Sequence, residues 1–197
     1  SVKPYAGFVN SPLFDAIPNC AMMSPSHIKE NEVFILRISV IGCGRWGSFI
    51  AWYLEHIGHS VLLYGRQESA RMQAFLHTRT NGLLTLPSSV RLCTQLTQAL
   101  DWGELIVLSI GVQNVRSFLR TLPPNALSDK TLLLCMKGLE AATGKRITEI
   151  VEEECGPSTP TAIWVGPGHV QDFVRHRPNC MVIDSAQPEL TARLIPR

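Results

Sequence analysis

The stretch RISVIGCGRWG, residues 37–47, is the most informative about the fold, because an apolar run passes there directly into the pattern Gly42-x-Gly44-x-x-Gly47. Turns that bind dinucleotides use these glycines for a tight turn, for close approach of the backbone to a pyrophosphate, and for packing of the helix on the strand, respectively. Apolar residues then recur at helical spacing, at Trp46, Ile50, Leu54 and Ile57. The glycines alone are weak evidence, but the strand before them and the amphipathic helix after them predict a dinucleotide-binding turn rather than a purely structural one.

The composition describes a globular protein with 45% hydrophobic residues, 17% charged residues and a net charge of +2. This balance lacks the basic signature of nucleic-acid-binding proteins. One short block of like charge, the glutamates at 152–154, is expected to be a solvated helix face. Arg37 interrupts the best apolar run before it reaches the roughly eighteen residues of a membrane span. We therefore expect a soluble protein without a nucleic-acid or membrane partner.

The cysteines and histidines show no spacing typical of a metal site or a disulfide framework. The six cysteines are scattered without a CxxC pair, at positions 20, 43, 93, 135, 155 and 180. Several lie in apolar runs, so reduced and buried thiols in a cytoplasmic protein are expected. The histidines likewise show no ligand spacing with cysteine or carboxylate, and no metal is predicted.

Residues 1–33 contain four prolines and no sustained period of 2 or 3.6, so an irregular N-terminal extension is expected there. This segment lacks the charged start and apolar core of a secretory signal. Residues 34–190 are expected to form one dinucleotide-binding domain, since the chain is long enough to bury a core of that size.

Strand and helix patterns alternate along this domain. Strands are expected at 33–41, 60–65, 90–93, 104–110, 131–136, 162–165 and 181–183. Helices are expected after the glycines, at 69–77, at 96–100, after residue 113, and at 145–155, where Gly156-Pro157 ends the pattern. The alternation predicts an α/β fold with a doubly wound, mainly parallel Rossmann-type sheet.

The end of the second expected strand bears on cofactor choice. In NAD-binding units, an acidic residue about 20 positions beyond the glycines accepts hydrogen bonds from the ribose 2′-hydroxyl. This chain has Gly65 there and Arg66 next, and a guanidinium can grip a 2′-phosphate, so the sequence favours NADP. The alternative is a solvated Arg66 with Glu68 serving the ribose of NAD.

Five collinear pieces between about 35 and 184 resemble the NAD(P)-dependent glycerol-3-phosphate dehydrogenases of glycerophospholipid synthesis. They are IGCGRWG (41–47), GHSVLLYGR (58–66), Gln113-x-x-Arg116, KGLEAATGKRITE (137–149) and GPGHVQDF (166–173). The run from 137 to 144 is the most specific, because ketopantoate and pyrroline-5-carboxylate reductases share the glycine fingerprint without it.

The resemblance implies roles for individual residues. It implies cofactor contacts at Gly42, Gly44, Arg45, Trp46, Gly47, Arg66, Lys137 and Val170. It implies contacts to a small phosphorylated substrate at Lys137, Gly166 and Gly168. The family places its acid/base lysine in a helical domain beyond this stretch, so no catalytic residue is assigned within the chain, and the isolated chain is expected to bind cofactor without turnover.

Position and departures from the family pattern qualify these roles. Lys137 follows a central strand and would face the crevice where open α/β sheets bind ligands, although a surface lysine before a turn glycine is the bland alternative. Family members usually have Ser or Thr followed by Phe-Ala where this chain has Gly168, His169 and Val170, which removes a hydroxyl from the substrate site. An exposed loop position is expected for His169. The loop at 81–87 is shorter than in the family pattern, so a different shape is expected at this edge of the cleft.

The sequence thus predicts the cofactor-binding domain of an NADP-preferring enzyme, with NAD as the second option, that interconverts dihydroxyacetone phosphate and glycerol 3-phosphate. Two alternatives stay open: a non-catalytic dinucleotide-binding module, and a reductase of another small carbonyl substrate. A homodimer is a further possibility for the assembly of the protein. The expected location is the cytoplasm.

Overall fold

The computed structural model describes residues 35–174 and 180–195, in which strands and helices alternate. The expected extension at 1–33 lies outside the described residues. The strands are β1 (Arg37–Ile41), β2 (Ser60–Tyr64), β3 (Arg91–Cys93), β4 (Leu105–Leu108), β5 (Thr131–Leu134), β6 (Thr161–Val165) and β7 (Val182–Ser185). The helices are α1 (Arg45–His56), α2 (Ala70–Thr78), α3 (Leu96–Trp102), α4 (Val115–Arg120), α5 (Ile147–Cys155), α6 (Val170–Val174) and α7 (Pro188–Leu194), with a 3-10 turn at Val112–Asn114 before α4.

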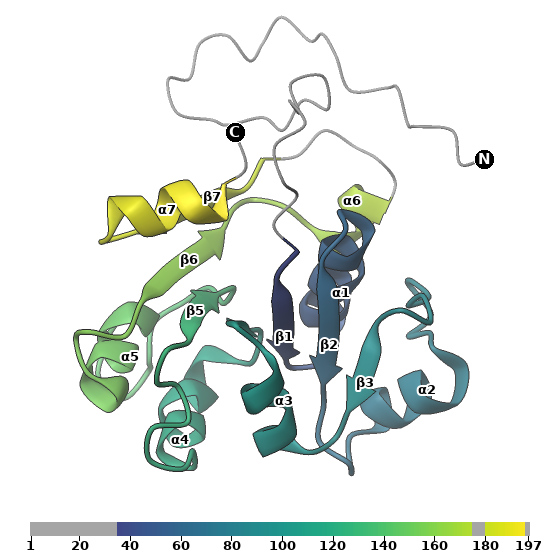
Figure 1. Cartoon of the computed structure of the whole chain (residues 1–197), viewed down its shortest axis with the longest axis horizontal. Coiled ribbons are helices and arrows are strands. Elements are labelled where there is room, and N and C mark those ends of the chain that lie inside the picture. Colours follow the sequence, from purple (N-terminus) through teal and green to yellow (C-terminus); the bar gives the residue numbers. More distant parts are fainter. Residues whose placement is uncertain (1–34, 175–179, 196–197) are drawn as a thin grey trace, which may run out of the picture.

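The strands form one twisted sheet in the order β3-β2-β1-β4-β5-β6-β7 (Figure 1). Every neighbouring pair is parallel except β6 and β7. The strand order reverses at β1, which pairs with β2 on one side and with β4 on the other. The prediction of a doubly wound, mainly parallel Rossmann-type sheet is confirmed, and ligands of such sheets bind at the carboxyl ends of the strands beside this reversal.

Alternate residues of each central strand enter two different cores. In β4, for example, Leu105 and Val107 belong to one core and Ile106 and Leu108 to the other. The first core includes residues of α1, α2 and α7, and the second includes residues of α3, α4 and α5. Continuous apolar strands are required because helices cover both faces of the sheet.

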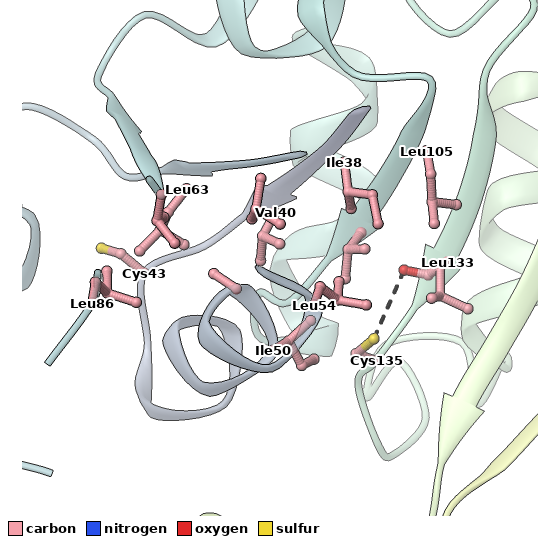
Figure 2. Packing of buried hydrophobic residues seen from close by; sticks show 14 of the residues in the cluster. Ile38, Val40, Cys43, Ile50, Leu54, Leu63, Leu86, Leu105, Leu133 and Cys135 are labelled. Atoms are coloured by element: carbon pink, nitrogen blue, oxygen red, sulfur yellow. Dashed lines mark hydrogen bonds between the residues drawn. The ribbon is translucent and has the colours of Figure 1, made fainter. Parts of the chain in front are cut away.

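Figure 2 shows the first core, where Ile50 and Leu54 of α1 pack against side chains of β1 and β5. Cys135, just beyond β5, is part of this core, and its Sγ points to the Leu133 carbonyl oxygen at 4.0 Å. Burial raises the pKa of the Cys135 thiol well above its ordinary value, so it behaves as a small apolar residue.

Several boundaries differ from the sequence prediction. The first strand begins at Arg37 rather than at 33, and residues 35 and 36 precede it without strand structure. In α1, Phe49 and Ala51 are buried together with Ile50 and Leu54, whereas Trp46 is only partly buried. The expected helix at 145–155 begins at Ile147, where the Glu149 carboxylate accepts from the backbone N–H of the N-cap residue Arg146 at 2.8 Å.

Helices α6 and α7 and the antiparallel direction of β7 were not predicted from the sequence. The short helix α6 lies against α1 (Figure 1), and its Phe173 ring is 6.0 Å from the ring of Trp46 in the first turn of α1. Helix α7 follows β7 and contributes Leu190 to the first core. No helix in the described part of the chain is long and apolar enough to cross a membrane.

Candidate functional site

The turn after β1 is held by contacts that only glycine permits. Gly42 has φ +117°, and a Cβ placed there would lie 2.3 Å from the carbonyl oxygen of Ser109. A Cβ at Gly47 would lie 2.0 Å from the carbonyl oxygen of Gly42. Ser109 directly follows β4, so Gly42 lets β1 and β4 meet at the topological switch point, and Gly47 lets α1 begin immediately above it.

Gly44 stands in a different environment. It is the N-cap of α1, with extended backbone at φ −70° and ψ −179°, and a Cβ there would meet no atom within 4 Å. A glycine N-cap carries no side chain to bond the free N–H groups of the first turn, and that turn contains no acidic residue. The start of α1 is therefore an open backbone surface of positive potential, suited to a phosphate group.

The end of β2 has no room for an acidic side chain at the position where NAD-binding units carry one. A Cβ at Gly65 would lie 2.6 Å from Cys43 Sγ and 2.9 Å from Met72 Cβ. Arg66 and Glu68, which follow, are both exposed. Burial is the main reason that the pKa of the nearby Tyr64 hydroxyl is raised, with Arg66 opposing this shift and Glu68 adding to it.

Three exposed cations flank this edge of the sheet, namely Arg45, Arg66 and Lys137. The ion pairs found among the described residues involve other cations and leave these three out. Cations that lack a carboxylate partner stay available for an anionic ligand, so the chemistry of this edge suits phosphate groups.

Trp46 is held in an aromatic cluster. Its ring stacks on Phe49 at 5.5 Å between centroids and approaches Phe173 of α6 at 6.0 Å. The cluster fixes the first turn of α1 against α6, which gives Trp46 a structural role beside any contact it makes to a ligand.

Lys137 lies in a cleft of about 520 Å³ at the carboxyl ends of β5 and β6. The cleft is lined by Met136, Lys137, Gly138, Arg146, Ile147, Thr148, Ile163, Val165 and Gly166. The structure therefore brings together Lys137 and Gly166, two of the three predicted substrate residues. Arg146 and Thr148, at the start of α5, were not predicted as residues of this cleft. They reach it because the loop at 137–146 folds back, so that Arg146 pairs with Leu139.

The loop that follows Lys137 is bonded to the segment that follows β4. Gln113 donates from Nε2 to the Leu139 carbonyl oxygen at 2.9 Å and accepts at Oε1 from the Ala141 N–H at 2.8 Å. Arg116 forms a two-pronged pair with Glu140, Nε to Oε1 and Nη2 to Oε2, both at 2.8 Å. The partners of the motif Gln113-x-x-Arg116 thus lie in the next motif along the chain, at 137–149.

Glu140 is the one charged residue that is buried among the described residues, with 7% of its surface exposed. The hydrogen bonds from Arg116 are the first cause that lowers its pKa to about 2, and the Thr143 hydroxyl adds to this. A buried carboxylate with both oxygens bonded to a guanidinium is well compensated for its loss of water.

The prediction that residues 152–154 form a solvated helix face is confirmed for the exposed Glu152 and Glu153 and is wrong for Glu154, whose side chain is 13% exposed. Arg116 reaches Glu153 at 2.9 Å and Glu154 at 2.5 Å, and Arg120 reaches Glu154 at 2.8 Å. These two glutamates face α4 because α5 packs beside it, and the acidic run is thereby neutralised. Glu152 is exposed.

The turn after β6 is tightly packed. A Cβ at Gly166 would lie 2.6 Å from the Cys180 carbonyl oxygen, and a Cβ at Gly168 would lie 2.5 Å from the Phe173 ring. Val170 is buried at 4% exposure, whereas His169 is exposed. Gly168 and Val170 are thus accounted for by packing of α6, and of this turn only Gly166 reaches the cleft.

The loop at 78–89 is tied to the glycine turn. Asn81 donates from Nδ2 to the Ser48 hydroxyl in the first turns of α1 at 2.9 Å. Arg79, in the left-handed region at φ 59°, bonds through its guanidinium to the Leu86, Pro87 and Val90 carbonyl oxygens. The described residues contain no group of three side chains able to hold a metal ion.

A mainly parallel sheet with its strand reversal at a glycine turn, an open helix start and unpaired cations defines a Rossmann-type dinucleotide-binding domain. The sequence profile of the NAD-dependent glycerol-3-phosphate dehydrogenase N-terminus matches residues 37–191. The chain belongs to this family.

Curated relatives and solved structures agree with this placement. The glycerol-3-phosphate dehydrogenase [NAD(P)+] of an Exiguobacterium strain is 32% identical over 76% of this chain and 45% of the relative, and that of Shouchella clausii is 34% identical over 78% and 47%. The glycerol-3-phosphate dehydrogenase structure from Coxiella burnetii matches with a TM-score of 0.74 at 20% identity, over 82% of this chain and 50% of that one, which supports the fold. The chain spans about half the length of the curated relatives it matches.

Proposed function

We propose that this chain binds NADPH at the turn after β1 and serves the interconversion of dihydroxyacetone phosphate and glycerol 3-phosphate. The observation that carries the proposal is the combination of an unobstructed Gly44 at the open start of α1 with an exposed Arg66 after a position too crowded for an acid. The pyrophosphate would lie on the N–H groups at the start of α1, and the 2′-phosphate on Arg66.

The cleft beside Lys137 is proposed as the place where the nicotinamide and the phosphorylated substrate meet. The cofactor supplies the hydride, and the protein supplies position and charge. Lys137 offers a cation that would stabilise the substrate phosphate or the negative charge that develops on the carbonyl oxygen. Gly166 lines the same cleft and would lie beside the substrate, whereas the substrate role of Gly168 and the cofactor role of Val170 would act through packing of α6.

A cytoplasmic location and a homodimer complete the proposal. The buried thiols of Cys43, Cys93 and Cys135 suit a reducing compartment. The homodimer is tested by sedimentation of the purified chain over a range of concentrations, which measures its mass in solution.

The cofactor assignment is tested by titrating NADPH and NADH against the chain and its Arg66→Ala variant. A guanidinium bonded to a doubly charged phosphate contributes about 1.5–3 kcal/mol, so wild type should bind NADPH at least about tenfold more tightly than NADH. Arg66→Ala should lose most of this preference while its affinity for NADH stays the same. Glu68→Gln is the matched control, because it alters the alternative ribose partner without touching the cation.

Equal affinity of the wild type for the two cofactors would remove the preference for NADP. In that case a large loss of NADH affinity in Glu68→Gln would assign the ribose to Glu68 and make NAD the cofactor. If the chain binds neither cofactor, the proposed function fails.

A further inference from the structure

Lys137 extends from a backbone that is fixed on both sides. Before it, β5 pairs with β4, and the pairing continues through the Cys135 N–H, which donates to the Leu108 carbonyl oxygen at 3.0 Å. After it, Gly138 turns the chain at φ +110°. The Cβ that Gly138 lacks would lie 3.5 Å from Val112 Cγ1, so the segment after β4 supports the loop directly beneath this turn.

Gln113 holds the next residues with both atoms of its amide group. The side chain donates to the Leu139 carbonyl oxygen and accepts from the Ala141 N–H. Its two bonds therefore hold the loop backbone in the way that a neighbouring β-strand would. Gln113 is exposed, and it packs into neither core. Removing it therefore costs little core packing and releases the loop that starts immediately after Lys137.

The rest of the loop is closed by its own bonds and by Arg116. The Glu140 N–H donates to the Lys145 carbonyl oxygen at 2.9 Å, and Leu139 bridges to Arg146, which lines the cleft. The Arg116–Glu140 pair anchors this hairpin to α4. Gln113 bonds the backbone of Leu139 and Ala141, whereas Arg116 bonds the side chain of Glu140 between them.

We propose that Gln113 is a positioning residue, which acts on bound cofactor through Lys137 by fixing the backbone at 139–141. This inference rests on the proposed function, in which Lys137 contacts the cofactor. A lysine side chain has several freely rotating bonds, so its contribution to binding depends on how well its backbone is held. The amide of Gln113 would therefore determine how much affinity Lys137 delivers, without touching the ligand.

The test is a double-mutant cycle on NADPH affinity in the full 197-residue chain, with wild type, Gln113→Ala, Lys137→Met and the double variant. Lys137→Met should weaken binding about tenfold, as expected for loss of a charged hydrogen bond. Gln113→Ala should weaken binding about threefold to tenfold in the wild-type background and by less than about 1.5-fold once Lys137 has been replaced. Gln113→Glu keeps the acceptor for Ala141 and loses the donor to Leu139, so an intermediate loss is expected.

Ser117→Ala on α4 is the matched control, because among the described residues its hydroxyl bonds only to the Asn114 carbonyl oxygen within its own segment. It should leave NADPH affinity unchanged. Equal losses from Gln113→Ala in the two backgrounds would show that Gln113 acts independently of Lys137 and would overturn the proposal. An unchanged affinity in Lys137→Met would overturn it as well. A wild type that binds no NADPH would instead defeat the proposed function itself, which separates the two failures.

Discussion

The glycine turn after β1 and the loop at 137–146 after β5, here called the lysine loop, lie at the same edge of the sheet. They are stabilised by different kinds of contact. In the glycine turn, backbone atoms approach so closely that Gly42 and Gly47 have no space for a Cβ. In the lysine loop, side chains make the connections: Gln113 bonds the backbone on either side of residue 140, and Arg116 bonds the carboxylate of Glu140.

The comparison separates two ways of preparing a binding site. Close backbone packing leaves no adjustable part, so the turn presents its N–H groups in one arrangement. Bonds between side chains can be altered one at a time, and the lysine loop should therefore change gradually under mutation. Three predictions test this contrast, in addition to the experiments on Arg66 and Gln113.

The largest effect is expected from Gly42→Ala. The new methyl group would meet the Ser109 carbonyl oxygen at 2.3 Å on a backbone at φ +117°, so strain and overlap combine. We expect the free energy of unfolding in urea to fall by more than about 3 kcal/mol. Gly58→Ala is the matched control, because Gly58 has φ +100° but no atom within 4 Å of the added carbon. Its cost should be limited to backbone strain of about 1–2 kcal/mol. Equal losses in the two variants would mean that close packing adds nothing at Gly42.

The next effect concerns binding rather than folding. Gly44→Val places a branched side chain at the open start of α1, on a backbone that any residue adopts, with no atom within 4 Å of the new Cβ. The free energy of unfolding in urea should change by less than about 1 kcal/mol. The affinity for NADPH, measured by fluorescence titration, should fall by about 100-fold. Gly44→Ala should lie between wild type and Gly44→Val. A variant that unfolds but keeps its affinity when folded would give Gly44 a structural role only.

The smallest effect is a dependence of stability on acid pH that arises in the lysine loop. Arg116 lowers the pKa of Glu140 from 4.5 to about 2, so the carboxylate prefers its ionised form in the folded chain. The stabilisation is present above about pH 4.5 and is lost as the pH falls toward about 2, because the unfolded chain then binds the proton first.

Urea unfolding at pH 7, 4 and 3 measures this effect. Glu140→Gln should lower the urea midpoint at pH 7 and make it less dependent on pH than in wild type. Some dependence should stay, because the pKa values of Glu149, Glu153 and Glu154 are also lowered by their basic partners. If the urea midpoint of Glu140→Gln depends on pH as strongly as that of wild type, the acid sensitivity belongs to these other carboxylates.

The sheet, the glycine turn and the cations that follow two of the strands could be predicted from the sequence. These features depend on neighbours in the chain: a continuous apolar strand, glycines at fixed spacing, and a helical period directly after them. Arg66 and Lys137 could be placed at the carboxyl edge for the same reason, since each directly follows the expected end of a strand.

How that edge is assembled depends on contacts that form only in the folded chain. The bonds from Gln113 and Arg116 to the loop at 139–141 join residues that are 24–28 positions apart. Glu153 and Glu154, which pair with Arg116 because α5 packs on α4, are still further from it in the sequence. The crowding at Gly65 likewise depends on Cys43 and Met72, which come from two other segments. A local pattern reports the residues that a segment contains, but whether a charge is paired and whether a position has room depends on distant segments that meet only when the chain folds.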